Sequence, residues 1–219
     1  MKDSFSFNSG ATNMVKLKGK IVSDIIYDHN YSGVHFYKLM VSTERLTDGK
    51  SDTIPVKLTE NLIDISSSHI ERTVCVLGQY HSFNRYEKGK SRLQLSVYAS
   101  YIDFMEDLGD KSYRNQVFLN GFICKPPVYR ITPKGCEITD ILLAVNRRSG
   151  KSDYIPCLCW GKDARHAASY KVGDKFATFG RIESREYYKN DFVFTAYEVS
   201  SVLTWDKDKM YTPVIEQLI

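Results

Sequence analysis

Hydrophobic and polar residues alternate with a period of two along much of this chain of 219 residues. The alternation is clearest in three segments, 15–21, 117–123 and 192–202. Successive side chains of a β-strand point to opposite faces, so this period predicts strands with one buried face. Two segments, 59–70 and 162–170, break the alternation, and we expect a short helix in each, with Asp163 as a cap for the second.

The sequence repeats itself at a nearly constant offset. Segment 13–21 returns as 115–123 with five identities in nine positions, and segment 49–55 returns as 150–156 with six in seven. A third set, at an offset of 102, pairs Gly78, Ser82 and Tyr86 with Gly180, Ser184 and Tyr188. Offsets this constant over about 90 residues indicate a duplicated domain.

Each copy has the same predicted order of three strands, a helix and two strands, with Gly-Lys-Ser-Asp at a hairpin turn. That is the order of a five-stranded OB barrel with its helix between strands three and four. We therefore predict an all-β protein with short helices, built from two tandem five-stranded OB-fold barrels. The expected divisions are a flexible leader 1–12, a first domain 13–104, a linker 105–114, a second domain 115–205 and a tail 206–219.

The composition, 42% hydrophobic and 26% charged, is that of an ordinary globular protein. The longest aliphatic run, 141–145, is too short for a membrane-spanning helix, and the N-terminus lacks the pattern of a secretory signal. We expect a cytoplasmic protein without a membrane partner. The five cysteines are odd in number and lack a Cys-x-x-Cys pair, which argues against a disulfide framework or a zinc site, and Cys157 and Cys159 are expected in the core.

The charge permits a nucleic-acid partner without requiring one. The net charge is +4, with +2 in residues 13–104 and +4 in residues 115–205. The two Gly-Lys-Ser sequences are not phosphate-binding loops, because Glu44 and Val145 stand where that motif needs a second glycine. The five histidines are scattered, and no nucleophile elbow is present. We expect no enzyme, no cofactor and no metal site.

Aromatic and basic residues are predicted to share the outer face of the second copy. In one strand, Ile155, Cys157 and Cys159 belong to the core, which leaves Tyr154 and Trp160 pointing outward. A later strand presents on one face Arg181, Glu183, Arg185 and Tyr187. Rings beside arginines bind single-stranded nucleic acid by base stacking and phosphate neutralisation.

Successive blocks of the second copy resemble bacterial single-stranded DNA-binding proteins. The blocks occur in the family's order at 115–121, 143–148, 155–164, 180–187 and 195–199. The resemblance implies an OB fold that binds single-stranded DNA with little sequence preference in replication, recombination and repair, in a nucleoid-associated protein. It implies base stacking on Tyr154, Trp160 and Tyr187, and we assign phosphate contacts to Arg147, Arg148, Lys162, Arg181 and Arg185. Family members commonly assemble four OB domains, so a homodimer is expected.

The first copy departs from this pattern. It has Thr53 for Tyr154, Thr59 for Trp160 and Arg85 for Tyr187. Such a copy either serves chiefly in assembly or binds DNA through other residues: Lys57, His81, Phe83, Arg85, Lys88, Lys90 and Arg92. The last residues, 212–219, lack the acidic, aromatic tip with which family members recruit repair enzymes, so recruitment by that route is not expected.

Two other functions remain open. An accessory protein of replication restart or conjugation would use the barrels mainly to dock other proteins, and the altered first copy favours that alternative. An RNA-binding module of the cold-shock kind would share the fold and the aromatic residues, but it would not share the ordered blocks. The sequence leaves open the DNA or RNA preference, the oligomeric state and the length of nucleic acid covered.

Overall fold

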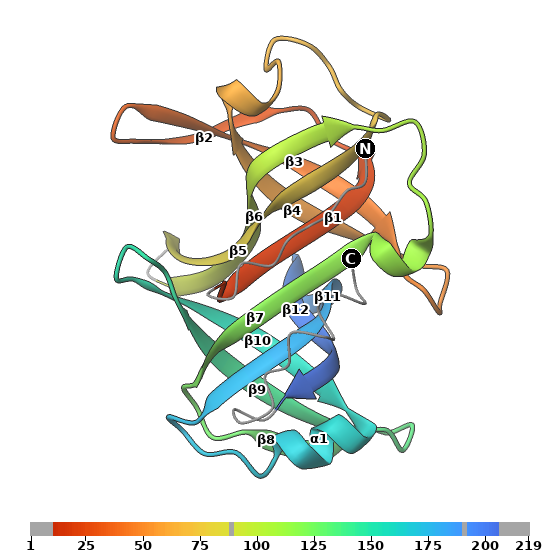
Figure 1. The fold of residues 1–219 in the computed structure, drawn as a ribbon, viewed down its shortest axis with the longest axis vertical. Coiled ribbons are helices and arrows are strands. Elements are labelled where there is room, and N and C mark those ends of the chain that lie inside the picture. Colours follow the sequence, from red (N-terminus) through yellow and green to blue (C-terminus); the bar gives the residue numbers. More distant parts are fainter. Residues whose placement is uncertain (1–10, 88–89, 190–191, 206–219) are drawn as a thin grey trace.

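A computed structural model describes residues 11–87, 90–189 and 192–205, and these form two β-barrels stacked along the long axis of the molecule (Figure 1). The first barrel contains β1 (Asn13–Ile21), β2 (Ile26–Tyr31), β3 (Val34–Glu44), β4 (Ser51–Thr59), β5 (Thr73–Glu87) and β6 (Lys90–Phe104). The second contains β7 (Asn115–Ile123), β8 (Val128–Ile131), β9 (Glu137–Asn146), β10 (Ser152–Trp160), β11 (Lys175–Lys189) and β12 (Phe192–Trp205). Most of the expected leader and all of the expected tail lie outside the described residues.

Both barrels close in the same way. In the first, β1 pairs with β3 and β4 runs parallel to β6; in the second, β7 pairs with β9 and β10 runs parallel to β12. Tight approaches at the closure explain one glycine pair of the repeat, because a Cβ at Gly19 would lie 2.2 Å from the Ser42 carbonyl oxygen and one at Gly121 would lie 2.3 Å from that of Ala144. The predicted pair of OB barrels is confirmed, with one extra strand in each copy, β2 and β8, paired with β3 and β9.

The second predicted helix is confirmed as α1 (Gly161–Ala167), but the first is wrong. Only a 3-10 turn, η1 (Glu60–Leu62), forms in the first copy. Downstream, the Asp64 carboxylate accepts hydrogen bonds from the backbone N and Oγ of Ser66 and from Oγ of Ser67, which offers this segment a turn in place of a helix. Asp163 does not cap α1 either, because the helix begins at Gly161 and Asp163 lies inside its first turn.

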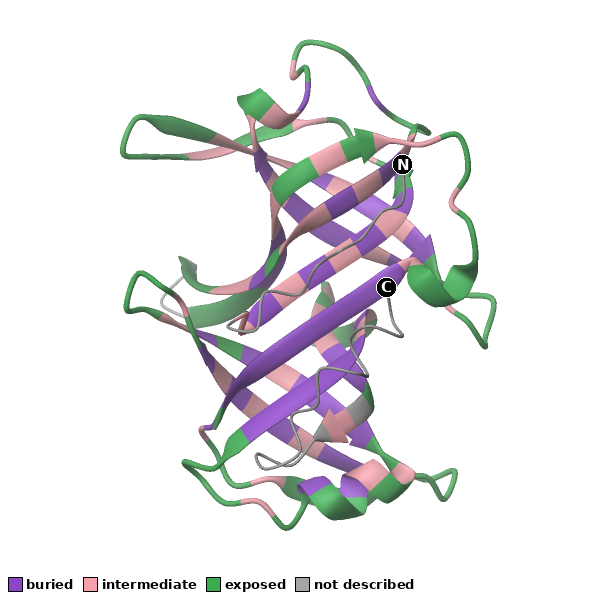
Figure 2. Cartoon of the chain, in the orientation of Figure 1, coloured by how far each residue is buried: buried purple, intermediate pink, exposed green. Residues whose placement is uncertain are grey.

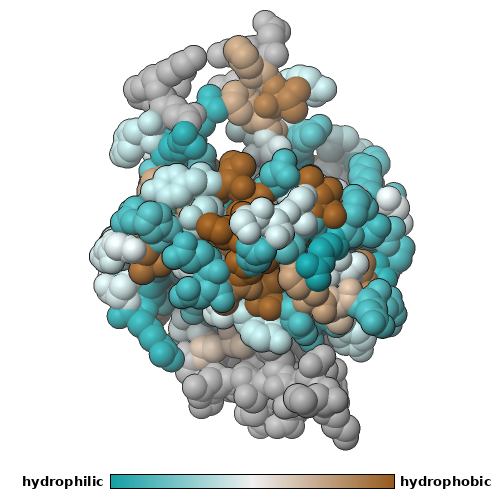
Figure 3. Space-filling model, turned by 90° about the horizontal axis from the view of Figure 1, so that it is seen from above, coloured by the Kyte–Doolittle hydropathy of each residue, from teal (hydrophilic) through white to brown (hydrophobic). Residues whose placement is uncertain are grey.

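The alternation places one face of each strand in a hydrophobic core. Ile155, Cys157 and Cys159 of β10 are buried, as predicted, and so are Val15 and Leu17 of β1. Burying a Val, Leu or Ile side chain contributes about 1.5–3 kcal/mol each, so these positions dominate the stability of the barrels. Figure 2 shows β7 buried along almost its whole length. Figure 3 looks onto the end formed by the first barrel, where hydrophilic residues surround a central group of hydrophobic ones.

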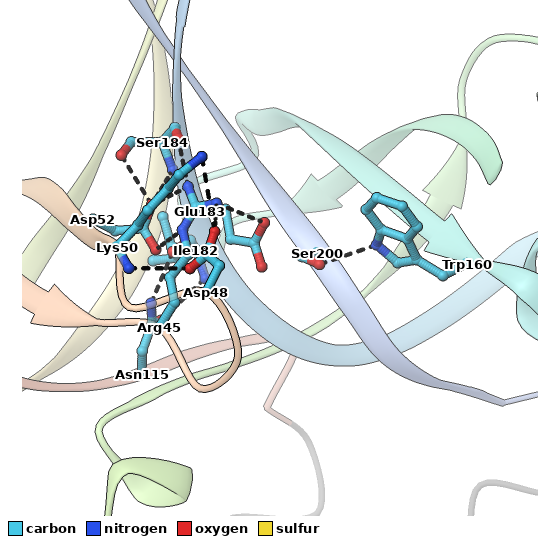
Figure 4. A network of polar contacts seen from close by, with 10 residues as sticks. All are labelled: Arg45, Asp48, Lys50, Asp52, Asn115, Trp160, Ile182, Glu183, Ser184 and Ser200. Atoms are coloured by element: carbon cyan, nitrogen blue, oxygen red, sulfur yellow. Dashed lines mark hydrogen bonds and ion pairs between the residues drawn. The ribbon is translucent and has the colours of Figure 1, made fainter. Parts of the chain in front are cut away.

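The barrels are joined by strand pairing and by two equivalent ion-pair clusters, which we name the staples. β1 pairs antiparallel with β7, so all twelve strands form one continuous sheet. In the first staple, Asp52 accepts hydrogen bonds from Arg45 and from the backbone N and Oγ of Ser184 in the other barrel (Figure 4). Arg45 also donates to the Ser184 carbonyl oxygen at 2.7 Å.

The second staple repeats the first with the barrels exchanged. Asp153 of the second barrel binds Arg147 and accepts a hydrogen bond of 2.6 Å from the backbone N of Ser82 in the first. Arg147 donates to the Ser82 carbonyl oxygen at 3.0 Å. The β3–β4 hairpin therefore lies against the second barrel and the β9–β10 hairpin against the first, which places basic residues of each copy beside the rings of the other.

Candidate nucleic-acid interface

Trp160 ends β10 with its indole 41% exposed. Its Nε1 donates a hydrogen bond of 3.1 Å to the Ser200 hydroxyl of β12 (Figure 4). The parallel pairing of β10 with β12 brings these two strands together. The indole is therefore anchored at the surface through its N–H.

A cleft of about 1130 Å³ runs beside Trp160 between the two barrels. Its basic lining residues are Arg45 and Lys50 from the first barrel's hairpin and Arg130 and Arg185 from the second barrel. Acidic residues also line it, namely Asp140, Glu183, Glu186 and Glu198. Some of these charges compensate each other, since Arg130 and Asp140 form an ion pair at 2.7 Å.

Glu198, which lines the cleft, has a carboxyl group with a raised pKa. Burial raises the pKa of this carboxyl group, and the nearby carboxylates of Asp140 and Glu183 act in the same direction, while Arg185 and Arg130 oppose the shift. Buried carboxyl groups favour the uncharged form. The carboxyl group of Glu198 is therefore easier to protonate than that of an exposed glutamate.

Tyr187 lies on the long β11–β12 hairpin and is 39% exposed. Its ring centroid is 5.6 Å from that of Phe194, opposite it in the strand pairing. The Arg92 guanidinium of the first barrel lies over the Phe194 ring at 4.2 Å. The two long hairpins therefore touch through a cation–π contact, and the Tyr187 ring extends a line of aromatic surface from there.

Tyr154 stands at the other end of β10 from Trp160 and is 45% exposed. Six strand residues span roughly 20 Å, so the two rings do not form one platform. The backbone N of Tyr154 donates to Ser82 Oγ at 2.7 Å, beside the first barrel. The three predicted stacking residues are thus all exposed and spread along the molecule.

The predicted basic residues occupy three different environments. Lys162 and Arg185 are exposed, the first next to α1's start and the second in the Trp160 cleft. Arg147 is held in the second staple, and exposed Arg148 lines a cleft against the first barrel. Nε and Nη1 of Arg181 are buried without a hydrogen-bond partner in the described part of the chain. We had assigned all five cations to phosphate contacts alongside the family resemblance, and they lie in separate places in the structure.

The residues of the first barrel that were predicted to contact DNA also differ in their exposure and partners. The Lys57 side chain is only 11% exposed and forms an ion pair of 2.6 Å with Asp28. Phe83 is 56% exposed, and Arg85 is exposed opposite Arg92 in the β5–β6 pairing. Lys88 lies outside the described residues.

The sequence did not identify three residues of the site: Ser200, which binds the Trp160 indole, and Arg45 and Lys50, which come from the other copy. The repeat did contain a signal for the contacts between the barrels. It included Ser82 and Ser184, and also the aspartate of each Gly-Lys-Ser-Asp turn. The repeat marked the staple residues, although only the fold shows that they meet across the two barrels.

Neither a metal site nor a spanning helix is found in the part of the chain that the structure describes. No three His, Cys, Asp or Glu side chains gather there to hold a metal ion. No helix among those residues is long and apolar enough to cross a membrane. All five cysteines are free, with Cys157 and Cys159 in the core.

The fold and the exposed rings define a tandem OB-fold protein with a candidate surface for single strands. Residues 114–203, which span the second barrel, match the model of the Single-strand binding protein family, and the resemblance seen in the sequence is confirmed.

Individual relatives agree with this assignment. A single-stranded DNA-binding protein 2 of Listeria innocua is 37% identical over 84 residues, 35% of this chain and 53% of that protein. One from Thermus thermophilus is 30% identical over 120 residues, 48% of this chain and 44% of that protein. The chain spans about half the length of the curated relatives it matches.

Solved structures extend the likeness of fold to both barrels. The wild-type single-stranded DNA binding protein from Thermus aquaticus has a TM-score of 0.73 at 20% identity, over 89% of this chain and 92% of that one. A deletion mutant of that protein has a TM-score of 0.72 at 21% identity, over 92% of this chain and 97% of the mutant chain. The duplicated OB architecture thus accounts for nearly the whole described chain.

Proposed function

We propose that the protein binds single-stranded DNA with little sequence preference, in DNA replication, recombination and repair. The observation that carries this proposal is the exposed Trp160 indole, fixed by Ser200 at the edge of a cleft that also holds Arg185. Stacking tolerates every base, because each base has a π-face. The role requires no covalent chemistry, so the protein acts as a binding protein rather than as an enzyme.

The charges of the cleft favour one orientation of the strand. Glu183 lines the cleft and repels phosphates, whereas Arg185 of the same lining and Lys162 on α1 have exposed side chains that can pair with them. Bases therefore turn inward to Trp160, and phosphates stay at the exposed cations. Beyond Arg185, the strand continues to Tyr187 on the β11–β12 hairpin.

The proposal includes a homodimeric assembly and a cytoplasmic location at the nucleoid. One chain supplies two OB barrels, so two chains in a homodimer would supply the four that family members commonly assemble. A cytoplasmic, nucleoid-associated place follows from the proposed ligand. Light scattering after size exclusion tests the dimer, and a mass of one chain at micromolar concentration contradicts it.

The first test is a titration of labelled oligo(dT) of about 30 nucleotides, long enough for two OB folds, against a duplex and an RNA of equal length. We expect selective binding of the DNA single strand, weakened by about 1–3 kcal/mol in Trp160→Ala. Tyr113→Ala is the matched control, since that ring is 43% exposed and lies on the linker, outside the cleft.

The result separates the alternatives. Weak binding of every nucleic acid contradicts the proposal and points to a docking protein of replication restart or conjugation. Preference for RNA points to a module of the cold-shock kind. Equal binding by wild type and Trp160→Ala would remove Trp160 from the interface.

A further inference from the structure

We propose that the first barrel carries a second base-stacking site for single-stranded DNA, built on Tyr98 in place of the missing tryptophan. This inference rests on the proposed function and deepens it. It assigns a binding role to the copy from which the three expected stacking residues are absent.

The strand register places Tyr98 on the strand that neighbours the position of the missing tryptophan. Lys57 pairs with Tyr98 in the parallel β4–β6 contact, as Leu158 pairs with Ser200 in the β10–β12 contact. Tyr98 is thus the counterpart of Ser200, the residue to which the Trp160 indole is hydrogen-bonded. Thr59, the counterpart of Trp160, is small and carries no ring, whereas Tyr98 on the neighbouring strand does.

Further rings surround Tyr98. Its ring centroid is 6.0 Å from that of Phe36 and 4.9 Å from that of His81. Phe36 in turn stacks on His29 at 4.7 Å, with the two planes 4° apart. By register, the second barrel has Ile138 in the place of Phe36 and Arg130 in that of His29. The first barrel therefore carries more aromatic surface here than the copy that retains the tryptophan.

Lys57 fixes this cluster. Its ammonium lies 5.6 Å from the Tyr98 ring centroid and 5.9 Å from that of Phe83, and it is held by Asp28. Because the ammonium is nearly buried and already paired, Lys57 is a positioning residue for the rings rather than a phosphate ligand. Phe83 remains 56% exposed beside it, which a ring serving only the core would not be.

The cations for this site come from the other barrel. A cleft of about 1030 Å³ is lined by His81 and Tyr98 of the first barrel and by Arg147 and Arg148 of the β9–β10 hairpin. Asp153 of that hairpin binds His81 Nδ1 at 2.8 Å, and His81 packs its edge against Tyr98. The second staple thus anchors the hairpin, which leaves exposed Arg148 available for a phosphate. The first barrel's Arg45 and Lys50 stand in the same relation to the Trp160 cleft.

The test compares two lengths of oligo(dT), about 12 nucleotides, within the span of one OB fold, and about 30. Tyr98→Ser introduces the residue that the second barrel has at this position, Tyr98→Phe keeps the ring, and Tyr113→Ala is the exposed-ring control. We expect Tyr98→Ser to weaken binding of the long strand by about 5- to 150-fold and to leave the short strand, held by the Trp160 site, unchanged. Tyr98→Phe should retain binding of both.

Failure of this inference is distinguishable from failure of the proposed function. If Trp160→Ala weakens both lengths while Tyr98→Ser changes neither, the first-barrel site is refuted and the proposed function stands. If the wild type binds neither length, both fail. Should Tyr98→Ser not fold, photocrosslinking of wild type to oligo(dT) containing 5-iodouracil decides, because the site requires adducts on the peptides that carry Phe83 or Tyr98, and adducts confined to the second barrel overturn it.

Discussion

Val15 of β1 and Val117 of β7 are equivalent positions of the two copies, and they stand directly opposite each other in the pair of strands that joins the barrels. Met14 faces Phe118, and Lys16 faces Gln116, so the pairing is symmetric about the two valines. An approximate twofold axis therefore passes between them. That axis explains why a contact made by one hairpin on the opposite barrel occurs twice in a single chain.

The staples make the barrels one cooperative unit. Asp153 has no exposed side-chain surface, and its removal would leave Arg147 and His81 without their shared acceptor. We expect Asp153→Ala to lower the free energy of unfolding by about 3–5 kcal/mol, measured by urea denaturation. Asp24→Ala, at an exposed position, is the control and should change it by less than about 0.5 kcal/mol. Equal effects of the two substitutions would contradict a structural role for the staple.

The same carboxylate should make stability depend on acidity. Burial raises the pKa of Asp153, but hydrogen bonds from His81, Arg147 and the backbone of Ser82 outweigh burial and hold it at about 2. A pKa below the unfolded value of about 3.9 means stability that is fully present above pH ~4 and lost as pH falls through ~2. Acid unfolding followed by circular dichroism should be less steep over that interval in Asp153→Asn. An identical slope in wild type and variant would refute the assignment.

The salt dependence of DNA affinity should distinguish cations that contact phosphates from cations that do not. For single strands, log affinity falls with log salt by about 0.7 per phosphate neutralised. We expect Arg148→Ala and Arg185→Ala each to reduce that slope by about 0.7, and Lys20→Ala to leave it unchanged, because Lys20 pairs with Glu71. Anisotropy titrations at four salt concentrations measure the slope. A salt-independent affinity would exclude both arginines from phosphate contact.

The orientation of Trp160 should depend on Ser200. Ser200→Ala removes the acceptor of the indole N–H and leaves the ring free to rotate. We expect DNA affinity to fall by about 0.5–1.5 kcal/mol, less than in Trp160→Ala. The chain has two tryptophans, so a Trp205→Phe background isolates the emission of Trp160. Lower fluorescence anisotropy in Ser200→Ala is the expected sign, and unchanged anisotropy with unchanged affinity would contradict it.

The cysteines should differ sharply in reactivity. Burial raises the pKa of Cys159 to about 12 and that of Cys157 well above its usual value, whereas Cys136 is exposed. The thiolate is the reactive form, so at pH 8 a disulfide reagent should modify Cys136 in the native protein and reach Cys157 and Cys159 only after unfolding. Mass spectrometry of the labelled peptides measures this. Rapid native labelling of Cys157 would contradict the core assignment.

Local patterns in the sequence determined the strands and the duplication. The period of two follows from strand geometry itself, which is why Ile155, Cys157 and Cys159 were placed in the core correctly. The hairpin turns were equally local, and Gly49 and Gly150 adopt the positive φ angles, +67° and +79°, that such turns require. The segment after Thr59 was mispredicted, because the hydrogen bonds of Asp64 to nearby serines compete with a helix.

Only the tertiary structure decided which residues of one copy serve the other. Arg147 was expected at a phosphate, and it lies in a staple, because the β9–β10 hairpin crosses to the first barrel. Tyr98 lies far from β4 in sequence and comes to lie beside Lys57, at the position of Ser200 in the second barrel, through the parallel β4–β6 pairing. Periodicity specifies which side of a strand faces inward, whereas the partner of its outer side depends on contacts between strands far apart in sequence, which no local pattern encodes.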